Sequence, residues 1–191
     1  MLSESSCRRY AESVRLSGGV EAALHCCVVL TAATEPVPAA RLAELHGVSA
    51  TYLAKHLQAL SRAELVHSVQ GKSGGYVLTR PPEEITALDV VEAVEGPQPT
   101  FVCTEIRQRG PMAAPPEACT APCAITRTMI AADRAWRAAL REVSIADLGR
   151  SVAQDYESDA LGEIANWLAG SVAPAGVRTQ SPIAAPGNRG H

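Results

Sequence analysis

Residues 38–80 place the strongest constraint on the fold, because they read as two helices and a hairpin in a fixed order. PAARLAELHG carries Leu42 and Leu45 on one apolar stripe and ends at Gly47, a residue type that often terminates a helix. VSATYLAKHLQALSRAELV follows, with Ser49 in position to cap a second helix. Two helices joined by a short glycine-containing turn form a helix-turn-helix, although any small helical bundle can contain such a pair.

The stretch after the second helix separates these two interpretations. LVHSVQGKSGGYVLTRP holds two runs of β type, 65–69 and 76–79, around the glycine-rich turn GKSGG. Glycines leave room for a close approach to phosphates, and Lys72 supplies positive charge. The order of elements predicts a winged helix-turn-helix. The expected fold class is mainly α with a small β-hairpin wing.

Charge is distributed unevenly along the chain. The net charge is −3, yet residues 36–82 contain five basic and two acidic residues, whereas residues 83–168 contain fourteen acidic and seven basic ones. A basic segment beside an acidic one suits a head that binds a polyanion and a body that does not. The sequence has no run of 18 apolar residues, and residues 1–13 lack the apolar segment of a secretion signal. We therefore expect a cytoplasmic protein without a membrane span.

The remaining segments indicate how the chain is organised. A long helix expected from residue 123 carries an apolar stripe, and a second copy of the chain is the usual partner for such a stripe in a DNA-binding dimer. The stripe consists of Ile125, Met129, Ala132, Trp136 and Leu140. We expect a disordered prefix at 1–13 that a start at Val14 would remove, a winged helix-turn-helix domain at 14–96, a cysteine-containing loop at 97–122, a dimerisation helix and C-terminal helical segment at 123–168, and a disordered tail at 169–191.

Three cysteines lie in or beside the proline-rich loop: Cys103, Cys119 and Cys123. Thiols gathered in one loop are better suited to binding a soft metal than to packing. A cluster or a closed zinc site needs four ligands, however, and the loop offers at most three. The chain must therefore supply a further ligand from elsewhere if the loop holds a metal.

The first helix, expected over 17–33, carries two candidate donors. Glu21 and His25 lie four residues apart and therefore on one helix face, within the chain or across a dimer from the loop. A first-turn glutamate with a satisfied core histidine is the alternative interpretation. Cys26 and Cys27 point to other faces of this helix, and we expect both to pack in the core.

The strings VRLSGGVEAALHCC and GKSGGYVLTRPPEEITALDVVEAVEG resemble the Rrf-type iron–sulfur winged-helix transcription regulators typified by IscR, NsrR and RsrR. The resemblance covers residues 14–150 and implies a homodimer in which a 2Fe-2S cluster, or else a 4Fe-4S cluster, controls affinity for DNA. The three loop cysteines are separated by 15 and 3 residues, and Thr126 stands where IscR-like members have a histidine. This pattern is closer to the RsrR-like scheme. That scheme implies Glu21, His25, Cys119 and Cys123 as ligands, with Cys103 either a further ligand or a spectator.

The same fold predicts which residues meet double-stranded DNA. The second helix of the pair, 49–60, would enter the major groove, and the wing would meet the adjacent phosphates or the minor groove. The predicted DNA-binding residues are Arg15, Ser49, Thr51, Tyr52, Lys55, Gln70 and Lys72. Two winged heads related by two-fold symmetry would bind an inverted-repeat operator.

The expected function is therefore a homodimeric transcription regulator, not an enzyme, whose iron–sulfur cluster senses redox state or nitric oxide. A regulator without iron would instead use Cys119 and Cys123 as a reversible disulfide or as reactive thiolates. A structural zinc adaptor is opposed by the wing and the recognition helix. An enzyme is opposed by a sequence without a phosphate-binding loop beyond the wing and without a Ser/His/Asp order.

Overall fold

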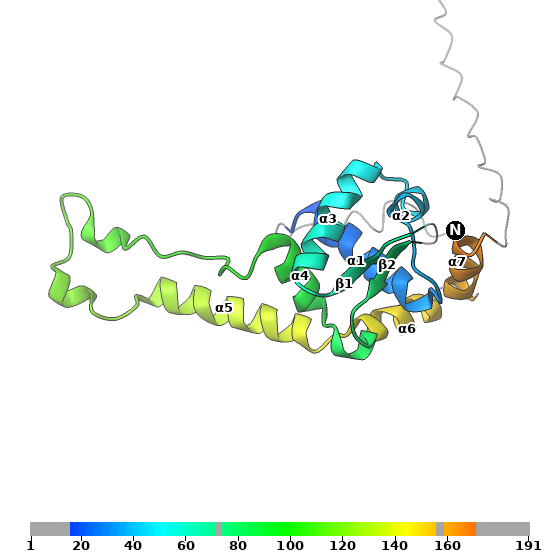
Figure 1. Ribbon diagram of the computed structural model, residues 1–191. Coiled ribbons are helices and arrows are strands. Elements are labelled where there is room, and N and C mark those ends of the chain that lie inside the picture. Colours follow the sequence, from blue (N-terminus) through cyan, green and yellow to red (C-terminus); the bar gives the residue numbers. More distant parts are fainter. Residues whose placement is uncertain (1–15, 72–73, 156–158, 171–191) are drawn as a thin grey trace, which may run out of the picture.

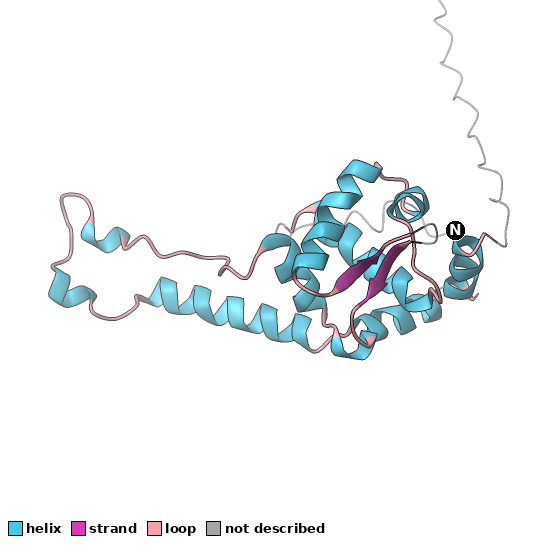
Figure 2. Ribbon diagram, viewed as in Figure 1, coloured by secondary structure: helices cyan, strands magenta, loops and turns pink. Residues whose placement is uncertain are grey.

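The computed structural model describes residues 16–71, 74–155 and 159–170 of the 191-residue chain. Within these residues, helices surround one two-stranded hairpin, shown in cyan and magenta in Figure 2. The elements are α1 (Gly18–Ala32), α2 (Ala39–Leu45), α3 (Ala50–Arg62), β1 (Val66–Val69), β2 (Gly75–Leu78), α4 (Ala87–Glu95), α5 (Ala124–Arg141), α6 (Ile145–Asp155) and α7 (Ala160–Leu168). The predicted fold class is confirmed. The predicted prefix and nearly all of the predicted tail lie outside the described residues.

Helix α1 forms the centre of the core, where it packs against α3, α4, α6 and α7. A helix that is apolar on most sides is typically a buried one. Cys26 and Cys27 are fully buried, and burial raises the pKa of Cys26 to about 12, so both act as small core residues as predicted. Ser17 precedes α1 without a side-chain capping bond. Its backbone N–H donates instead to Glu95 at 2.8 Å, which ties the start of α1 to the end of α4.

Helices α2 and α3 form the predicted helix-turn-helix. The Oγ atom of Ser49 accepts a hydrogen bond from the backbone N–H of Tyr52 at 3.1 Å, so Ser49 caps α3 as predicted. Between the helices, Gly47 has a φ of +62°, in the left-handed region that favours glycine. The buried side of α3 carries Leu53, Leu57 and Leu60. Burial of this side leaves the opposite face of α3 to solvent.

Strands β1 and β2 pair antiparallel, with Val66 opposite Leu78, and they match the predicted runs closely. Gly75 packs directly on the connection between α1 and α2, because a Cβ atom at this position would lie 2.3 Å from the carbonyl carbon of Val37. Val37 and Tyr76 also exchange two backbone hydrogen bonds of 3.0 and 2.8 Å. The glycines of the turn were expected to allow approach to phosphates. The structure gives Gly75 a packing role instead, since backbone lies against it.

The winged helix-turn-helix part of the chain, α1 to α4 with the hairpin, is called the head. The segment between α4 and α5 extends away from the head and forms an arm (Figure 1). After Gly96 the chain runs out alongside α5, passes through two 3-10 turns (Ile106–Gln108 and Pro116–Cys119) and returns as α5. The predicted C-terminal helical segment consists of two helices, α6 and α7, both packed on α1. Among the described residues, no helix is long and apolar enough to cross a membrane.

Candidate functional site

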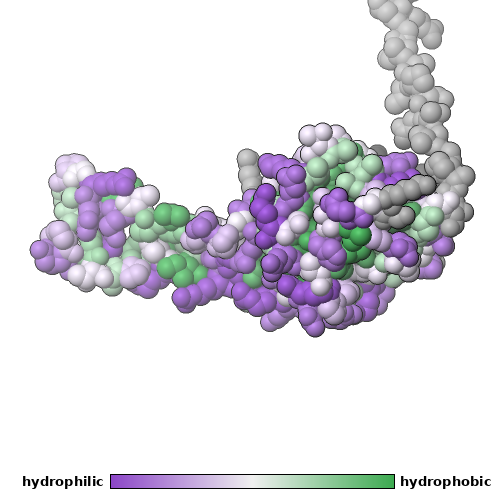
Figure 3. Space-filling model, in the orientation of Figure 1, coloured by the Kyte–Doolittle hydropathy of each residue, from purple (hydrophilic) through white to green (hydrophobic). Residues whose placement is uncertain are grey.

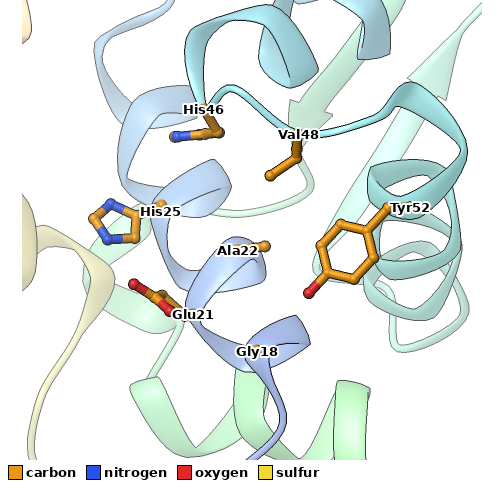
Figure 4. Close-up of a pocket in the computed structure, with 7 residues that line it drawn as sticks. All are labelled: Gly18, Glu21, Ala22, His25, His46, Val48 and Tyr52. Atoms are coloured by element: carbon orange, nitrogen blue, oxygen red, sulfur yellow. The ribbon is translucent and has the colours of Figure 1, made fainter. Parts of the chain in front are cut away.

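The N-terminal half of α3 presents the predicted DNA-reading residues. Exposed side chains there are Ser49, Thr51 and Lys55. Tyr52 is also partly exposed, but its ring packs edge-on against His56, with ring centroids 4.7 Å apart. Its hydroxyl points toward Gly18 at the start of α1, as Figure 4 shows. Tyr52 was predicted to face outward with Lys55, and its side chain is 40% exposed, although its hydroxyl lies against the N-terminal end of α1.

The wing supplies one further exposed candidate within the described residues. Gln70 follows β1 and is exposed. Lys72 at the wing tip and Arg15 before α1 lie outside the described residues. The DNA contacts of all three residues stay predictions.

Glu21 and His25 lie side by side on an exposed face of α1, one helical turn apart (Figure 4). Because His25 is exposed, the alternative of a satisfied core histidine does not describe this residue. The pair borders two hollows. One, of about 440 Å³, is lined also by His46, Val48 and Tyr52, and the other, of about 530 Å³, lies between α1 and α6.

His46 belongs to this site and was missed in the sequence. It follows α2, and its ring centroid lies 5.7 Å from that of His25. Its Nε2 atom is buried and has no hydrogen-bond partner among the described residues. Burial, and then the neighbouring His25, lower the pKa of His46, which favours the neutral imidazole. No spacing rule links positions 25 and 46, so only the fold, which brings the end of α2 beside His25, reveals this neighbour.

Helix α1 contacts the recognition helix next to the Glu21 and His25 face. A Cβ atom at Gly19 would lie 2.2 Å from Cε1 of His56 on α3. His56 is only 7% exposed, so it has little room to move away. Glycine at this position therefore allows the N-terminal end of α1 to touch α3.

The three loop cysteines differ in their surroundings. Cys103 is exposed, whereas Cys119 and Cys123 are half-buried. Cys123 caps α5, because the backbone N–H of Thr126 donates to its Sγ atom at 3.4 Å and the Thr126 hydroxyl lies 3.3 Å from the same atom. These hydrogen bonds, together with the charge of Arg107, lower the pKa of the Cys123 thiol. The thiolate, which binds metals and reacts with oxidants, is thereby favoured.

Arg107 is a second residue that the sequence did not single out. Its Nε and Nη2 atoms donate to the Glu105 carboxylate at 2.6 and 2.9 Å, and Nη2 also donates to the carbonyl oxygen of Ala121 at 3.0 Å. This places a positive charge near both Cys119 and Cys123. The arginine precedes the cysteines by a stretch of irregular loop, so no periodic signal connects them.

The structure keeps the two halves of the predicted ligand set apart. Glu21 and His25 lie on α1, whereas Cys119 ends the 3-10 turn Pro116–Cys119 and Cys123 caps the N-terminal end of α5, the end in the arm (Figure 1). That helix has 18 residues and spans about 27 Å. Across residues 16–71, 74–155 and 159–170, no group of three or more His, Cys, Asp or Glu side chains could hold a metal ion. A site that uses all four residues therefore needs a second copy of the chain or a folded-back arm.

Helix α5 exposes apolar side chains along the arm, where Figure 3 shows green surface. The exposed residues include Ile125, Met129 and Ile130, while Trp136 and Leu140 of the predicted stripe are half-buried. An amphipathic helix whose apolar face stays uncovered within its own chain is typical of a subunit interface.

Curated relatives match the head of the chain. The chain is 42% identical over 74 residues to Protein aau3 of Rhizobium meliloti, covering 39% of this chain and 46% of that protein. It is 43% identical over 68 residues to HTH-type transcriptional regulator IscR of Aliivibrio salmonicida, covering 36% and 40%. The matched segment thus spans less than half the length of these relatives.

Solved structures extend the likeness beyond the head. Staphylococcus aureus CymR is similar with a TM-score of 0.52 and 26% identity, covering 70% of this chain and 96% of that one. The structure of T. potens IscR has a TM-score of 0.56 at 22% identity, covers 78% and 96%, and shows likeness of fold. A family model described as Rrf2, iron-dependent transcriptional regulator, matches residues 16–151, and the chain therefore belongs to the Rrf2 family.

Proposed function

We propose that this chain is a homodimeric transcription regulator that binds an inverted-repeat site in double-stranded DNA, and that an iron–sulfur cluster controls its affinity for that site. The observation that carries the proposal is the position of Glu21 and His25. They lie on the helix that touches the recognition helix, while α3 presents Thr51 and Lys55 to solvent beside the wing. Membership of the Rrf2 family and the IscR relatives support the same assignment.

The donor set fits a cluster shared between two subunits. Glu21 and His25 of one copy would combine with Cys119 and Cys123 of the other, since a single chain holds these pairs apart. Mixed imidazole and thiolate ligation is known for 2Fe-2S clusters, which is the cluster type we propose, with a 4Fe-4S cluster as the alternative. Metal ligands must be deprotonated, and the lowered pKa of Cys123 meets this need. Cys103, exposed in the same loop, is either a third thiolate or a spectator.

When bound, such a cluster supplies one-electron chemistry and a charge that changes with its oxidation state. The protein supplies the ligands and connects them to the DNA-binding surface. Glu21 and His25 lie two and six residues after Gly19 on α1, and Gly19 contacts His56 of α3. A small shift of α1 therefore changes the position of the recognition helix relative to the wing. Movement of a packed helix of this kind is a common switching device.

Anaerobic purification followed by iron and sulfide analysis tests this proposal. We expect coloured protein that contains iron and acid-labile sulfide in equal amounts. Its affinity for a DNA duplex selected in vitro by the protein should change when the iron is removed. Protein that contains iron but selects no DNA sequence would contradict the winged-head assignment. Protein that selects DNA with the same affinity with and without iron would contradict cluster control.

A thiol-based regulator without iron is the second candidate, and the environment of Cys123 favours it. The thiol is hydrogen-bonded by Thr126, lies near Arg107 and has a lowered pKa, which are properties of redox-sensing cysteines. A solved neighbour at 25% identity and a TM-score of 0.54 is an oxidised form of Staphylococcus aureus CymR. This candidate predicts colourless protein whose DNA affinity changes with peroxide and returns with dithiothreitol. A zinc adaptor predicts colourless protein that binds no DNA.

A further inference from the structure

Two charged side chains of α5, Asp133 and Arg137, hold the first residues of the cysteine loop. The Nη2 atom of Arg137 donates to the carbonyl oxygens of Gln98 at 2.8 Å and Pro97 at 3.2 Å. Asp133 Oδ1 accepts from the hydroxyl of Thr100 at 2.9 Å and from its backbone N–H at 3.3 Å. The start of the loop is thus fastened to α5 by four hydrogen bonds.

The guanidinium of Arg137 also reaches α4. Its Nη1 atom forms a hydrogen-bonded ion pair with Glu92, and its Nε atom donates to Asp133 Oδ2 at 2.9 Å. The side chains of Arg137 and Asp133 are 16% and 13% exposed, so solvent screens this cluster less than an ordinary surface pair. The planar fork of arginine contacts α4, α5 and the loop at once. A lysine at this position has three donors on a single nitrogen and lacks the planar fork that holds these contacts in the arginine.

Helix α4 leads from this cluster to the recognition helix. It packs against both α1 and α3, and Val90 of α4 lies in the same buried core cluster as Leu57 of α3. The backbone joins α4 to the loop through Gly96, where φ is +94°. A glycine joint absorbs backbone rotation easily. Arg137 bonds to Glu92 before Gly96 and to the carbonyl oxygens of Pro97 and Gln98 after it. These bonds across the glycine make the loop and α4 move together.

We propose that Arg137 is a positioning residue that couples the state of the cysteine loop to the recognition helix. A change at Cys119 or Cys123 that pulls on the loop then displaces α4, and with it the core contacts of α3, instead of being absorbed at Gly96. This inference rests on the proposed function, because it takes the loop as the sensor and α3 as the reading element.

The experiment measures how strongly chemical modification of the loop changes DNA affinity in the full-length chain. Iodoacetamide modifies accessible thiols in a Cys7→Ser background, while Cys26 and Cys27 are fully buried and stay unmodified. The probe is a DNA duplex selected in vitro by the unmodified wild-type protein. The ratio of the Kd after alkylation to the Kd before it measures the coupling between loop and DNA-binding surface.

Arg137→Gln should move this ratio closer to one by a factor of roughly 2 to 30. This is the size of the effect that mutations have on the coupling between two sites in other proteins. Arg137→Lys keeps the charge but not the fork, so its ratio should fall between those of Arg137→Gln and the wild type. Arg134→Gln removes the same charge from an exposed position of α5 and should keep the wild-type ratio. Thr100→Val removes a side-chain bond of an exposed residue and leaves both ion pairs in place. It should bring the ratio toward one without changing the melting temperature.

Wild-type ratios in both Arg137→Gln and Thr100→Val would overturn this inference and leave the proposed function standing. A merely structural arginine would lower the melting temperature and weaken DNA binding equally before and after alkylation. The ratio would then be unchanged, which also overturns the inference. A ratio of one in the wild type itself would overturn the inference together with the proposed role of the loop as the sensor.

Discussion

Combining two defective subunits tests whether the proposed metal centre lies between two copies of the chain. One variant carries Glu21→Ala and His25→Ala, and the other carries Cys119→Ala and Cys123→Ala. The head and the cysteines lie at opposite ends of α5, a helix about 27 Å long, so the site we propose takes its two halves from different subunits. Neither variant alone can form a complete site, and we expect both homodimers to contain no cluster.

A heterodimer of these variants recovers one of its two symmetry-related sites. The intact head of one subunit meets the intact cysteines of the other once per dimer, and the second site lacks all four ligands. The purified heterodimer should therefore hold about one half of the wild-type iron, and an unsorted random mixture about one quarter.

Two affinity tags separate the heterodimer, and iron and sulfide analysis with the visible spectrum gives its cluster content. The matched control carries all four substitutions in one subunit beside a wild-type partner. A shared site predicts no cluster in this control, because each site then lacks one half. The opposite pattern, with an empty heterodimer and about one half of the iron in the control, would place all four ligands in one subunit and refute the reasoning.

Gly75→Ala should lower the free energy of unfolding by about 2–4 kcal/mol, since the new methyl group meets backbone and disturbs two backbone hydrogen bonds. Urea unfolding measures this loss, and a change below about 0.5 kcal/mol would contradict the contact. Trp167→Ala should cost about 1–3 kcal/mol, because the Arg41 guanidinium lies 3.6 Å from the centre of the indole ring and α7 loses a packed side chain. An unchanged thermal midpoint would show that α7 does not stabilise α2 through this pair. In metal-free protein, Cys123 should react with iodoacetamide with a midpoint pH below the ordinary thiol value of about 8.5, because a lowered pKa keeps the thiolate present at lower pH. Thr126→Val should raise that midpoint, as followed by mass spectrometry, and equal midpoints would mean that the bond between the Thr126 hydroxyl and the sulfur has no effect.

Much of the reading head was predictable from local sequence. Ser49 caps α3 as expected, Gly47 lies in the turn between α2 and α3, and the two strands lie where the alternating runs predicted. Each of these features depends on residues a few positions apart, because caps, tight turns and hairpins are formed by neighbours in the chain. The placement of Cys26 and Cys27 in the core followed from helical periodicity for the same reason.

The sequence by itself also determined which donors exist: a carboxylate and an imidazole on one face of α1, and three thiols in one loop. The tertiary structure alone decided what surrounds them. It brought His46 beside His25, Arg107 beside the thiols, and Arg137 across the base of the loop. It also placed Cys119 and Cys123 in the arm at the N-terminal end of α5, away from the donors on α1. These contacts join positions far apart in the chain, and they arise from the way helices bury their apolar faces against one another. Local sequence patterns do not show how helices pack against one another. The candidate ligands could therefore be identified from the sequence, but their separation into two distant parts of the molecule could not.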